Sequence, residues 1–191
     1  MGDVRFIIIT VPPPAVANAL EGPRRLAAER SGSHAALAYP PHVTLRTGAV
    51  VPALNISEFA AGIRAALGPW RPFTITAREL FHTPYEDGDG DLRHMVGWRV
   101  DANEPLCKLH RDLLSFGRFQ LRPQPAFEPH LTLAFDDLEE AQAEELLAYA
   151  RSRPDLFPPE LRWTCDNVGL FRKCDGAWEP YIAFSAPEGT S

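Results

Sequence analysis

The sequence predicts an α+β fold of two lobes related by an internal duplication. A pattern of Pro, His, an apolar residue, Thr and Leu occurs at 41–45 and again at 129–133, and its histidines lie 88 positions apart (130 − 42). A Leu-Phe pair recurs at a similar distance, since residues 80–81 and 170–171 are 90 apart (170 − 80). Short β-branched runs alternate with segments of helical periodicity around these repeats. We therefore expect two antiparallel sheets that face a central cleft, with the helices outside.

The length and charge of the chain limit its organisation and its partners. A chain of 191 residues suits one bilobal domain, with a first repeat over about 4–100, a second over about 101–186 and a disordered tail at 187–191. The formal net charge is −6 without a long basic block, which argues against a protein that grips long duplex nucleic acid. A small nucleotide or a single RNA terminus remains a suitable partner, because it needs only a local positive site.

The cysteines and the N-terminal segment indicate a cytoplasmic protein. The three cysteines, Cys107, Cys165 and Cys174, form no CxxC pair, which is typical of free thiols in a reducing compartment. The apolar run at 4–11 is too short to span a bilayer and lacks the features of a signal peptide. We expect a monomer without a membrane partner, a metal or another cofactor, because the sequence contains no tight cluster of metal ligands.

The first half of the chain predicts a strand, a helix, the motif strand, a second helix and a hairpin. Residues 4–11 form a β-branched run that a proline triplet ends, and 15–30 have helical periodicity. Pro40 and Pro41 favour an extended backbone into the first motif. Residues 57–67 predict a helix, and strands at 73–81 and 94–100 flank an acidic turn at 86–91.

The second half repeats this order. Residues 104–116 carry the apolar stripe of a helix, and 130–135 form the second motif strand. Asp136 or Asp137 is expected to cap a helix that runs to about 152. Residues 162–172 predict one strand, 174–176 a turn and 178–185 the final strand.

Alternation along the motif strands predicts which side chains act together. In a strand, every second side chain points to the same face. His42, Thr44 and Arg46 should therefore share one face, and Val43 and Leu45 should face the core. In the second motif strand the same rule groups residues 130, 132 and 134 on one face and 131, 133 and 135 on the other.

Two histidines and two threonines on facing strands suit the cleavage of a phosphodiester. Histidine has an unperturbed pKa of about 6.5, so His42 and His130 could divide the tasks of proton donor and proton acceptor. Thr44 and Thr132, each two residues further on, could hydrogen-bond phosphoryl oxygens as negative charge develops. This arrangement needs no metal, and it suits in-line attack with one histidine on either side of phosphorus.

The doubled motif, Pro-His-Val-Thr-Leu and Pro-His-Leu-Thr-Leu, resembles that of the two-histidine (2H) phosphoesterase superfamily. This superfamily includes the 2′-5′ RNA ligase-like proteins and the RNA 2′,3′-cyclic phosphodiesterases, and the resemblance covers about residues 4–185. It implies a bilobal fold and metal-independent opening of a 2′,3′-cyclic phosphate. It further implies that His42 donates a proton to the leaving ribose oxygen, that His130 activates water, and that Thr44 and Thr132 hold the phosphate.

One departure from the family leaves the subfamily and the substrate open. The RNA ligase-like members often carry a basic residue soon after the second motif, where this chain has Ala134, Phe135 and two aspartates. Arg46 follows the first motif instead. Arg46 either supplies positive charge to the phosphate or forms a surface salt bridge.

The remaining candidates concern base recognition and the class of protein. An aromatic side chain at the end of a third strand could stack a base, although core packing is the commoner role of such residues, which are Phe81, Tyr85 and Phe171. A cyclic phosphodiesterase, with 2′-5′ ligation as a further activity, is the leading hypothesis. A nucleotide or RNA-end binding protein with little turnover is the alternative. A metal-dependent hydrolase is a third hypothesis, which the lack of a carboxylate–histidine cluster disfavours.

Overall fold

The structure is a computed structural model that describes residues 2–87, 90–114, 119 and 127–186, so the tail at 187–191 lies outside the described residues. The first part of this chain forms β1 (Asp3–Thr10), α1 (Pro14–Ser31), β2 (Val43–Pro52), α2 (Ile56–Leu67), β3 (Phe73–Glu86) and β4 (Leu92–Val100). The second part forms α3 (Glu104–Asp112), β5 (His130–Phe135), α4 (Glu140–Ser152), β6 (Glu160–Cys165), β7 (Asn167–Cys174) and β8 (Ala177–Ser185). Short 3₁₀ helices, η1 (Ala35–Ala38) and η2 (Ala53–Asn55), flank β2.

The strands form one antiparallel sheet in the order β6-β3-β4-β5-β2-β1-β7-β8. Its middle is weak, because β5 and β2 share the single residue pair Val43–Leu131 in the described chain, whereas the other neighbours pair over several residues. The sheet is therefore two four-stranded halves that meet at the motif strands. This architecture confirms the predicted α+β bilobal fold.

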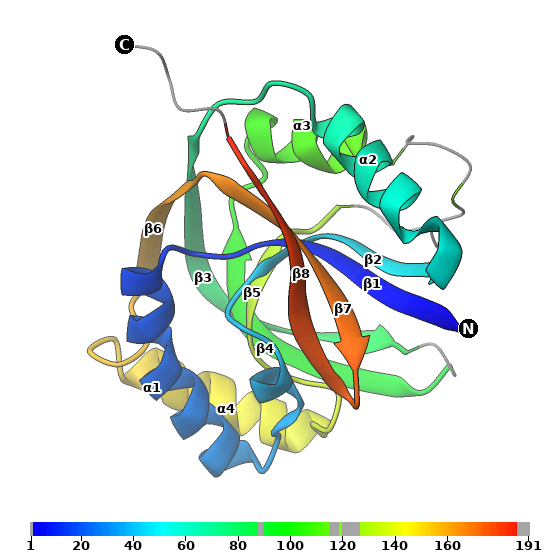
Figure 1. Ribbon diagram of the computed structural model, residues 1–191. Coiled ribbons are helices and arrows are strands. Elements are labelled where there is room, and N and C mark those ends of the chain that lie inside the picture. The colour runs from blue at the N-terminus through cyan, green and yellow to red at the C-terminus, as the bar shows by residue number, and fades with distance from the viewer. Residues whose placement is uncertain (1, 88–89, 115–118, 120–126, 187–191) are drawn as a thin grey trace.

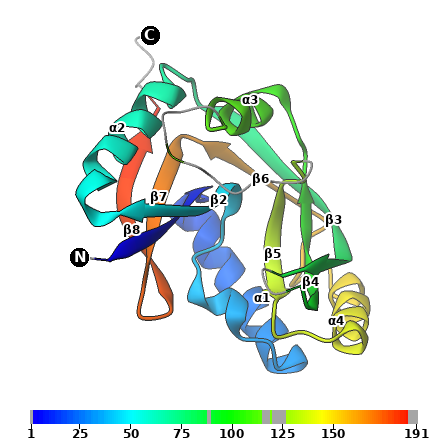
Figure 2. The same ribbon diagram turned by 90° about the vertical axis from the view of Figure 1, so that its right-hand side faces the viewer.

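The helices lie in two pairs at opposite ends of the molecule. Figure 1 shows α2 and α3 together at the top and α1 and α4 together at the bottom. The first pair packs on β2, and the second pair packs on β3, β4 and β5. Figure 2 shows β1, β2, β7 and β8 on the left and β3 to β6 on the right. Each half of the sheet thus combines strands and helices from both parts of the sequence.

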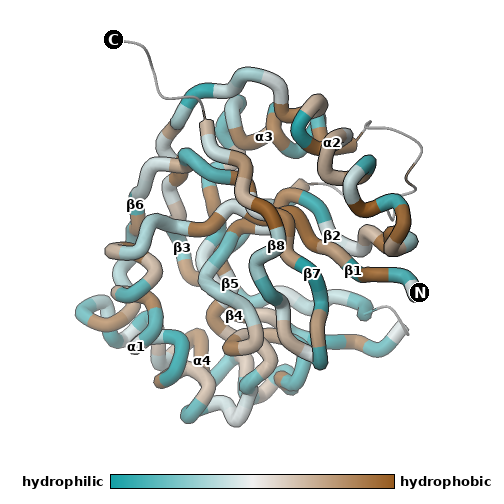
Figure 3. Tube along the Cα trace, viewed as in Figure 1, coloured by the Kyte–Doolittle hydropathy of each residue, from teal (hydrophilic) through white to brown (hydrophobic). Residues whose placement is uncertain are grey.

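The core lies between the sheet and these helices. Figure 3 shows hydrophobic residues concentrated along the strands at the centre of the molecule. Phe6 and Ile8 of β1 are fully buried in this core with Phe59 of α2. The alternate residues Ile7 and Ile9 form a smaller cluster on the other face of the sheet with Phe171, next to the first motif. Both faces of β1 are therefore apolar, which explains the continuous run of isoleucines in the sequence.

Two helix boundaries show how the local sequence determines the chain path. Helix α1 begins at a proline, whose missing N–H costs nothing in the first turn, and ends at Gly32, which has a φ of 73°. The predicted Asp136 or Asp137 cap of α4 is wrong, because Glu139 is the cap and forms a reciprocal pair with Gln142. Asp137 instead accepts hydrogen bonds from the backbone N–H groups of residues 34 and 35 at the start of η1.

The predicted single strand at 162–172 is also wrong, because it is two strands. Strand β6 pairs with β3 in one half of the sheet, and β7 pairs with β1 in the other. Asp166 is the one residue between them. The break is marked in the sequence only by the polar pair Asp166 and Asn167, and the pattern of a strand does not say which partner it pairs with. The helix expected over 104–116 ends at Asp112, and 115–118 lie outside the described residues.

Candidate active site

The two motifs meet at the centre of the sheet. Val43 and Leu131 are directly paired in antiparallel strands, and both side chains lie in the core. Continuing this register places residue 42 across from 132 and residue 44 across from 130, with all four side chains on the face opposite the core pair. The structure thus brings together His42, Thr44, His130 and Thr132, which we call the two-histidine face.

Each motif histidine is held by a backbone carbonyl two residues before it. His42 Nδ1 lies 2.8 Å from the carbonyl oxygen of Pro40, and His130 Nδ1 lies 2.8 Å from that of Glu128. A carbonyl can only accept, so Nδ1 carries the proton in both rings. In the neutral imidazole, Nε2 then has a lone pair. The repeated local geometry therefore presents two equivalent proton-accepting nitrogens.

The electrostatic surroundings make the two histidines unequal. Burial, together with the charges of Arg24 and His130, lowers the pKa of His42 to about 4, against the opposing effect of the Pro40 carbonyl. Burial also lowers the pKa of His130, but the carbonyl and the charge of Glu128 both raise it. Both rings are consequently neutral at pH 7 in the free protein, and a positive charge is less favourable on His42.

A β-bulge follows the histidine at the same position in both motif strands. In β2, Thr44 pairs with Ile9 but Arg46 pairs with Ile8, so Leu45 is the extra residue. In β5, Thr132 pairs with Gly97 but Ala134 with Val96, so residue 133 is extra. The third residue after each histidine thus shifts the alternation by one.

These bulges correct two expectations about faces. Cross-strand partners share a face, so Arg46 lies on the side of the core residue Ile8 and not with His42. Arg46 is 4% exposed, burial lowers its pKa, and its charge acts on His110 of α3. Ala134 likewise lies in the core, not with His130. We therefore do not retain Arg46 as a phosphate contact.

The threonines and a glycine complete the two-histidine face. Thr132 Oγ1 donates a weak hydrogen bond to Met95 Sδ at 3.7 Å, and a phosphate oxygen could replace the sulfur as its acceptor. Thr44 is half-buried beside Ile9. Gly97 lies across from Thr132, and a Cβ there would be 2.4 Å from the Leu131 carbonyl oxygen. The close approach of β4 and β5 at this point therefore requires glycine.

Phe81 is the predicted aromatic residue that the structure brings to a motif histidine. Its ring centroid lies 6.3 Å from that of His130 in an edge-on arrangement. Arg99 pairs directly with His130 across β4 and β5, and its guanidinium lies 4.6 Å from the Phe81 ring centroid. Arg99 is exposed, and the Glu79 carboxylate lies 3.9 Å away. Sequence analysis missed Arg99 because nothing local to it indicates which residue lies across from it.

The other two predicted aromatic residues have different surroundings. Phe171 is 7% exposed and packs against Ile7 and Ile9. It is therefore mainly a packing residue in the half of the sheet that contains the first motif. Tyr85 lies four residues beyond Phe81 along β3, or about 13 Å. Burial and the charge of Asp136 raise the pKa of Tyr85, which places it among charged loop residues rather than beside His130.

Two aromatic residues beside His42 were also missed. Tyr39 stacks on the His42 ring with centroids 5.4 Å apart, and Trp178 stacks on Tyr39 at 5.7 Å. Tyr39 is three residues before His42 and could have been noticed from that proximity. Trp178 is far away in sequence, and only the pairing of β1 with β7 and of β7 with β8 brings it near.

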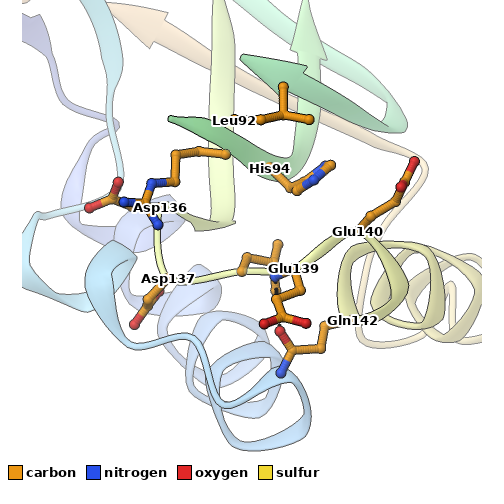
Figure 4. Close-up of a pocket in the computed structure, with 9 residues that line it drawn as sticks. Leu92, His94, Asp136, Asp137, Glu139, Glu140 and Gln142 are labelled. Carbon is orange, nitrogen blue, oxygen red and sulfur yellow. Dashed lines mark hydrogen bonds between the residues drawn. The ribbon is translucent and has the colours of Figure 1, made fainter. Parts of the chain in front are cut away.

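A separate cavity of about 510 Å³ lies beyond the end of β5. Figure 4 shows His94 of β4 above Glu139, with Glu140 of α4 to its right. His94 Nδ1 lies 2.9 Å from His82 Nε2, and His82 is half-buried in this histidine pair. None of the residues of the two-histidine face lines this cavity. Among the described residues, no group of three or more His, Cys, Asp or Glu could hold a metal ion.

The fold and the doubled motif are those of the two-histidine phosphoesterases, and comparison with known proteins supports this class. The model of the 2′-5′ RNA ligase superfamily matches residues 12–177. The chain therefore belongs to this superfamily. A Bacillus licheniformis protein named "Putative phosphoesterase" is 26% identical over 146 residues, which are 76% of this chain and 79% of that protein. No helix in the described chain is long and apolar enough to cross a membrane.

Solved structures of low sequence identity share the fold. E. coli LigT in complex with 3′-AMP superposes with a TM-score of 0.62 at 16% identity, over 97% of this chain and 99% of that chain. The Thermus thermophilus protein TT0787 gives 0.61 at 19% identity, over 95% and 97%. Kluyveromyces marxianus Usb1 gives 0.55 at 13% identity, over 96% and 98%.

Proposed function

We propose that this protein is a metal-independent phosphodiesterase that opens 2′,3′-cyclic phosphates of nucleotides or RNA ends. The observation that carries this proposal is the pairing of Val43 with Leu131, which puts both histidines and both threonines on one face. Each histidine there has its Nδ1 proton bonded to a carbonyl, which leaves Nε2 for the substrate. Such a pair suits a reaction in which one proton is taken and one is given.

The proposed reaction balances with these two groups and one proton from solvent. One imidazole accepts a proton from water as the water oxygen attacks phosphorus. The other imidazole, neutral in the free protein, takes up a solvent proton when the anionic substrate binds and donates it to the ribose oxygen as the bond from that oxygen to phosphorus breaks. The product is a phosphomonoester with a free neighbouring hydroxyl. The same attack with the 5′-hydroxyl of a second ribose in place of water would form a 2′-5′ linkage, as the bond from phosphorus to the 3′-oxygen breaks and that oxygen takes the proton.

Phosphate binding is the proposed task of Thr44, Thr132 and Arg99. The threonine hydroxyls can donate to non-bridging oxygens as their charge increases. The two neutral histidines bring no positive charge to the site before substrate binds. Arg99 lies across from His130 and can supply that charge, because paired residues have Cβ atoms about 5 Å apart and a guanidinium extends further. This assigns to Arg99 the role we first expected of Arg46.

Relatives of the same fold support a small anionic substrate. E. coli LigT has been solved with 3′-AMP, with ATP and with phosphate. These ligands share a phosphate group, and two of them share a nucleoside. The stacked pair Tyr39 and Trp178 beside His42 could pack against the base of a nucleotide substrate, since aromatic rings stack on any base.

The test is hydrolysis of 2′,3′-cyclic nucleotides with EDTA present, for the wild type and the single variants His42→Ala and His130→Ala. Removing a general acid or base typically costs about 10²–10⁴-fold in rate, so both variants should fall by that factor. His34→Ala is the matched control, because His34 is exposed and its side chain lies outside the two-histidine face. An inactive wild type, or one unaffected histidine variant, would contradict the proposal.

The second candidate is a protein that binds nucleotides or RNA ends on the same scaffold with little turnover. The lowered pKa of His42 favours it, since a group that resists protonation is a poor proton donor. Calorimetric titration with 3′-AMP separates the two candidates. Binding without hydrolysis of any cyclic nucleotide would support the second, and hydrolysis that depends on both histidines would exclude it.

A further inference from the structure

His110 is a buried histidine of helix α3 that contacts a residue close to each motif. It is 7% exposed, and its Nδ1 lies 2.8 Å from the carbonyl oxygen of Leu45, three residues after His42. Its ring stacks on that of Phe127, three residues before His130, with centroids 4.0 Å apart and an angle of 14° between the planes. One side chain therefore reaches both the end of the first motif and the approach to the second.

The hydrogen bond to Leu45 satisfies a backbone carbonyl at the bulge of β2. Leu45 is fully buried and is the extra residue opposite β1, and in the described chain β5 pairs with β2 at Val43 alone. A bulged residue is left out of the ladder, and a buried carbonyl without a partner is costly. Because a carbonyl can only accept, Nδ1 of His110 carries a proton. Burial and the charge of Arg46 lower the pKa of His110 against the opposing effect of this carbonyl, so the ring is neutral at pH 7.

The stack on Phe127 acts on the support of the second motif histidine. Phe127 directly precedes Glu128, whose carbonyl oxygen lies 2.8 Å from Nδ1 of His130. Phe127 is half-buried and packs against the core. A displacement of Phe127 would therefore displace the acceptor that orients the His130 ring.

The contacts of His110 matter because the sheet is weak where the two motifs meet. In the described chain β2 and β5 share the single pair Val43–Leu131, so the placement of one motif against the other depends on contacts outside the ladder. Helix α3 lies on the core side of this junction, since its Leu106 and Leu109 belong to the same core as that pair. His110 therefore acts from behind the sheet and touches no substrate on the two-histidine face.

We propose that His110 is a positioning residue that fixes the two motifs relative to each other across this weak junction. Its Nδ1–H holds the bulge that follows Thr44, and its ring holds the segment that presents the Glu128 carbonyl to His130. The hydroxyl of Thr44 and the Nε2 atom of His130 are thereby kept at a constant separation around the phosphate. The inference rests on the proposed function, because it concerns the geometry of that reaction.

The test compares His110→Phe and Phe127→Leu with the control His94→Phe. His110→Phe keeps an aromatic ring but removes the Nδ1 donor, and Phe127→Leu removes the stack but keeps the donor. His94 is also 7% exposed, and its Nδ1 lies 2.9 Å from His82 Nε2, so its replacement likewise removes one buried hydrogen bond. For each folded variant we measure kcat and KM for a 2′,3′-cyclic nucleotide, the free energy of unfolding in urea, and the NMR resonances of the two motif imidazoles, assigned through their alanine variants.

We expect His110→Phe and Phe127→Leu each to lower kcat at least about 10-fold with little change in KM, because misplacing a catalytic group by about 1 Å can cost about 10²-fold in rate. The ring resonances of at least one motif histidine should shift in both variants. His94→Phe should lose stability to a similar extent and keep the wild-type kcat and resonances, because the side chain of His94 pairs with His82 and lines the separate cavity.

The outcomes separate this inference from the proposed function. With an active wild type, an unchanged kcat in either His110→Phe or Phe127→Leu would overturn the inference, and so would an equal loss of kcat in His94→Phe. If His110→Phe does not fold, Phe127→Leu decides in its place. An inactive wild type rejects the proposed function, and the ring resonances, which need no turnover, then decide the inference. Motif resonances that shift in His110→Phe but not in His94→Phe would leave it standing, and unshifted resonances would overturn it.

Discussion

Val43 of β2 pairs with Leu131 of β5, and each is the residue directly after a motif histidine. This pair joins the two halves of the sheet in the described chain, and the two-histidine face lies on its other side. The same β-bulge two residues later, at Leu45 and at Leu133, repeats the local geometry in both strands. The duplication is therefore visible in backbone detail as well as in sequence. What differs between the two motifs is their surroundings.

Replacing the motif threonines should slow hydrolysis without unfolding the protein. Thr44→Val and Thr132→Val keep the side-chain shape but remove the hydroxyl, and losing one donor to a developing negative charge can cost about 10²-fold in kcat. Initial-rate kinetics on a cyclic nucleotide provide the measurement. Thr164→Val is the control, because Thr164 is exposed on β6, far along the sheet from the motif strands. Equal rates for all three variants would remove the threonines from the site.

Arg99 should matter for binding the substrate anion. Arg99→Met is expected to raise KM by about 10-fold, since a hydrogen bond to a charged group contributes about 1.5–3 kcal/mol. Arg78→Met on the adjacent strand is the matched control, because Arg78 is a comparably exposed arginine whose partners are Asp101 and Glu160. The two KM values are compared at low salt, where surface charges are least screened. If both variants bind substrate equally well, the cation of the site lies elsewhere.

An activated leaving group should distinguish the proton donor from the proton acceptor. A nitrophenyl ester of a nucleoside phosphate releases a stable anion that needs no proton, so losing the donor should matter less for it. The family resemblance implies that His42 is the donor, so we expect the defect of His42→Ala to shrink with this substrate and that of His130→Ala to remain. Rates of both variants on the activated and the cyclic substrate give the comparison. The opposite pattern would assign the donor to His130.

The partly buried position of His42 and its lowered pKa should make folding stability depend on pH. Its pKa is about 4 in the folded protein and about 6.5 when unfolded, so between these values the unfolded state binds more protons. The free energy of unfolding should therefore fall as the pH drops from 6.5 toward 4, by up to about 1.4 kcal/mol per pH unit from this group. Above pH 6.5, protonation of His42 should have no effect on it. Urea unfolding at pH 5 and pH 7.5 tests this. Glutamine cannot titrate, so the free energy of unfolding of His42→Gln should fall less between pH 7.5 and pH 5 than that of the wild type.

Gly97 should tolerate no side chain. A Cβ at this position would approach the Leu131 carbonyl oxygen to 2.4 Å, which is backbone and cannot swing away. Gly97→Ala should lower the free energy of unfolding by about 1–3 kcal/mol and reduce activity, because β5 must shift. Gly22→Ala is the control, since nothing lies within 4 Å of a Cβ there and alanine favours the helix by about 1 kcal/mol. Thermal melting of both variants gives the answer.

The sequence by itself determined the fold class, the duplication and the four residues that meet at the centre. These depend on local regularities: a repeated motif, a period of two in strands and a period near four in helices. A repeat of the same polar side chains on one face of a strand can be read without knowing what lies next to it. The single strand expected at 162–172 failed because the pattern of a strand does not name its partner, and β6 pairs with β3 while β7 pairs with β1.

Only the tertiary structure decided which other residues join the site. The bulges at Leu45 and Leu133 turned Arg46 and Ala134 to the core side, because an extra residue against a single partner shifts the alternation. Pairing across strands brought Arg99 to His130, and packing of α3 brought His110 to the bulge at Leu45. These contacts join residues far apart in the chain, so they depend on which elements pack together. That choice is made by the whole core and leaves no mark in the sequence around each residue.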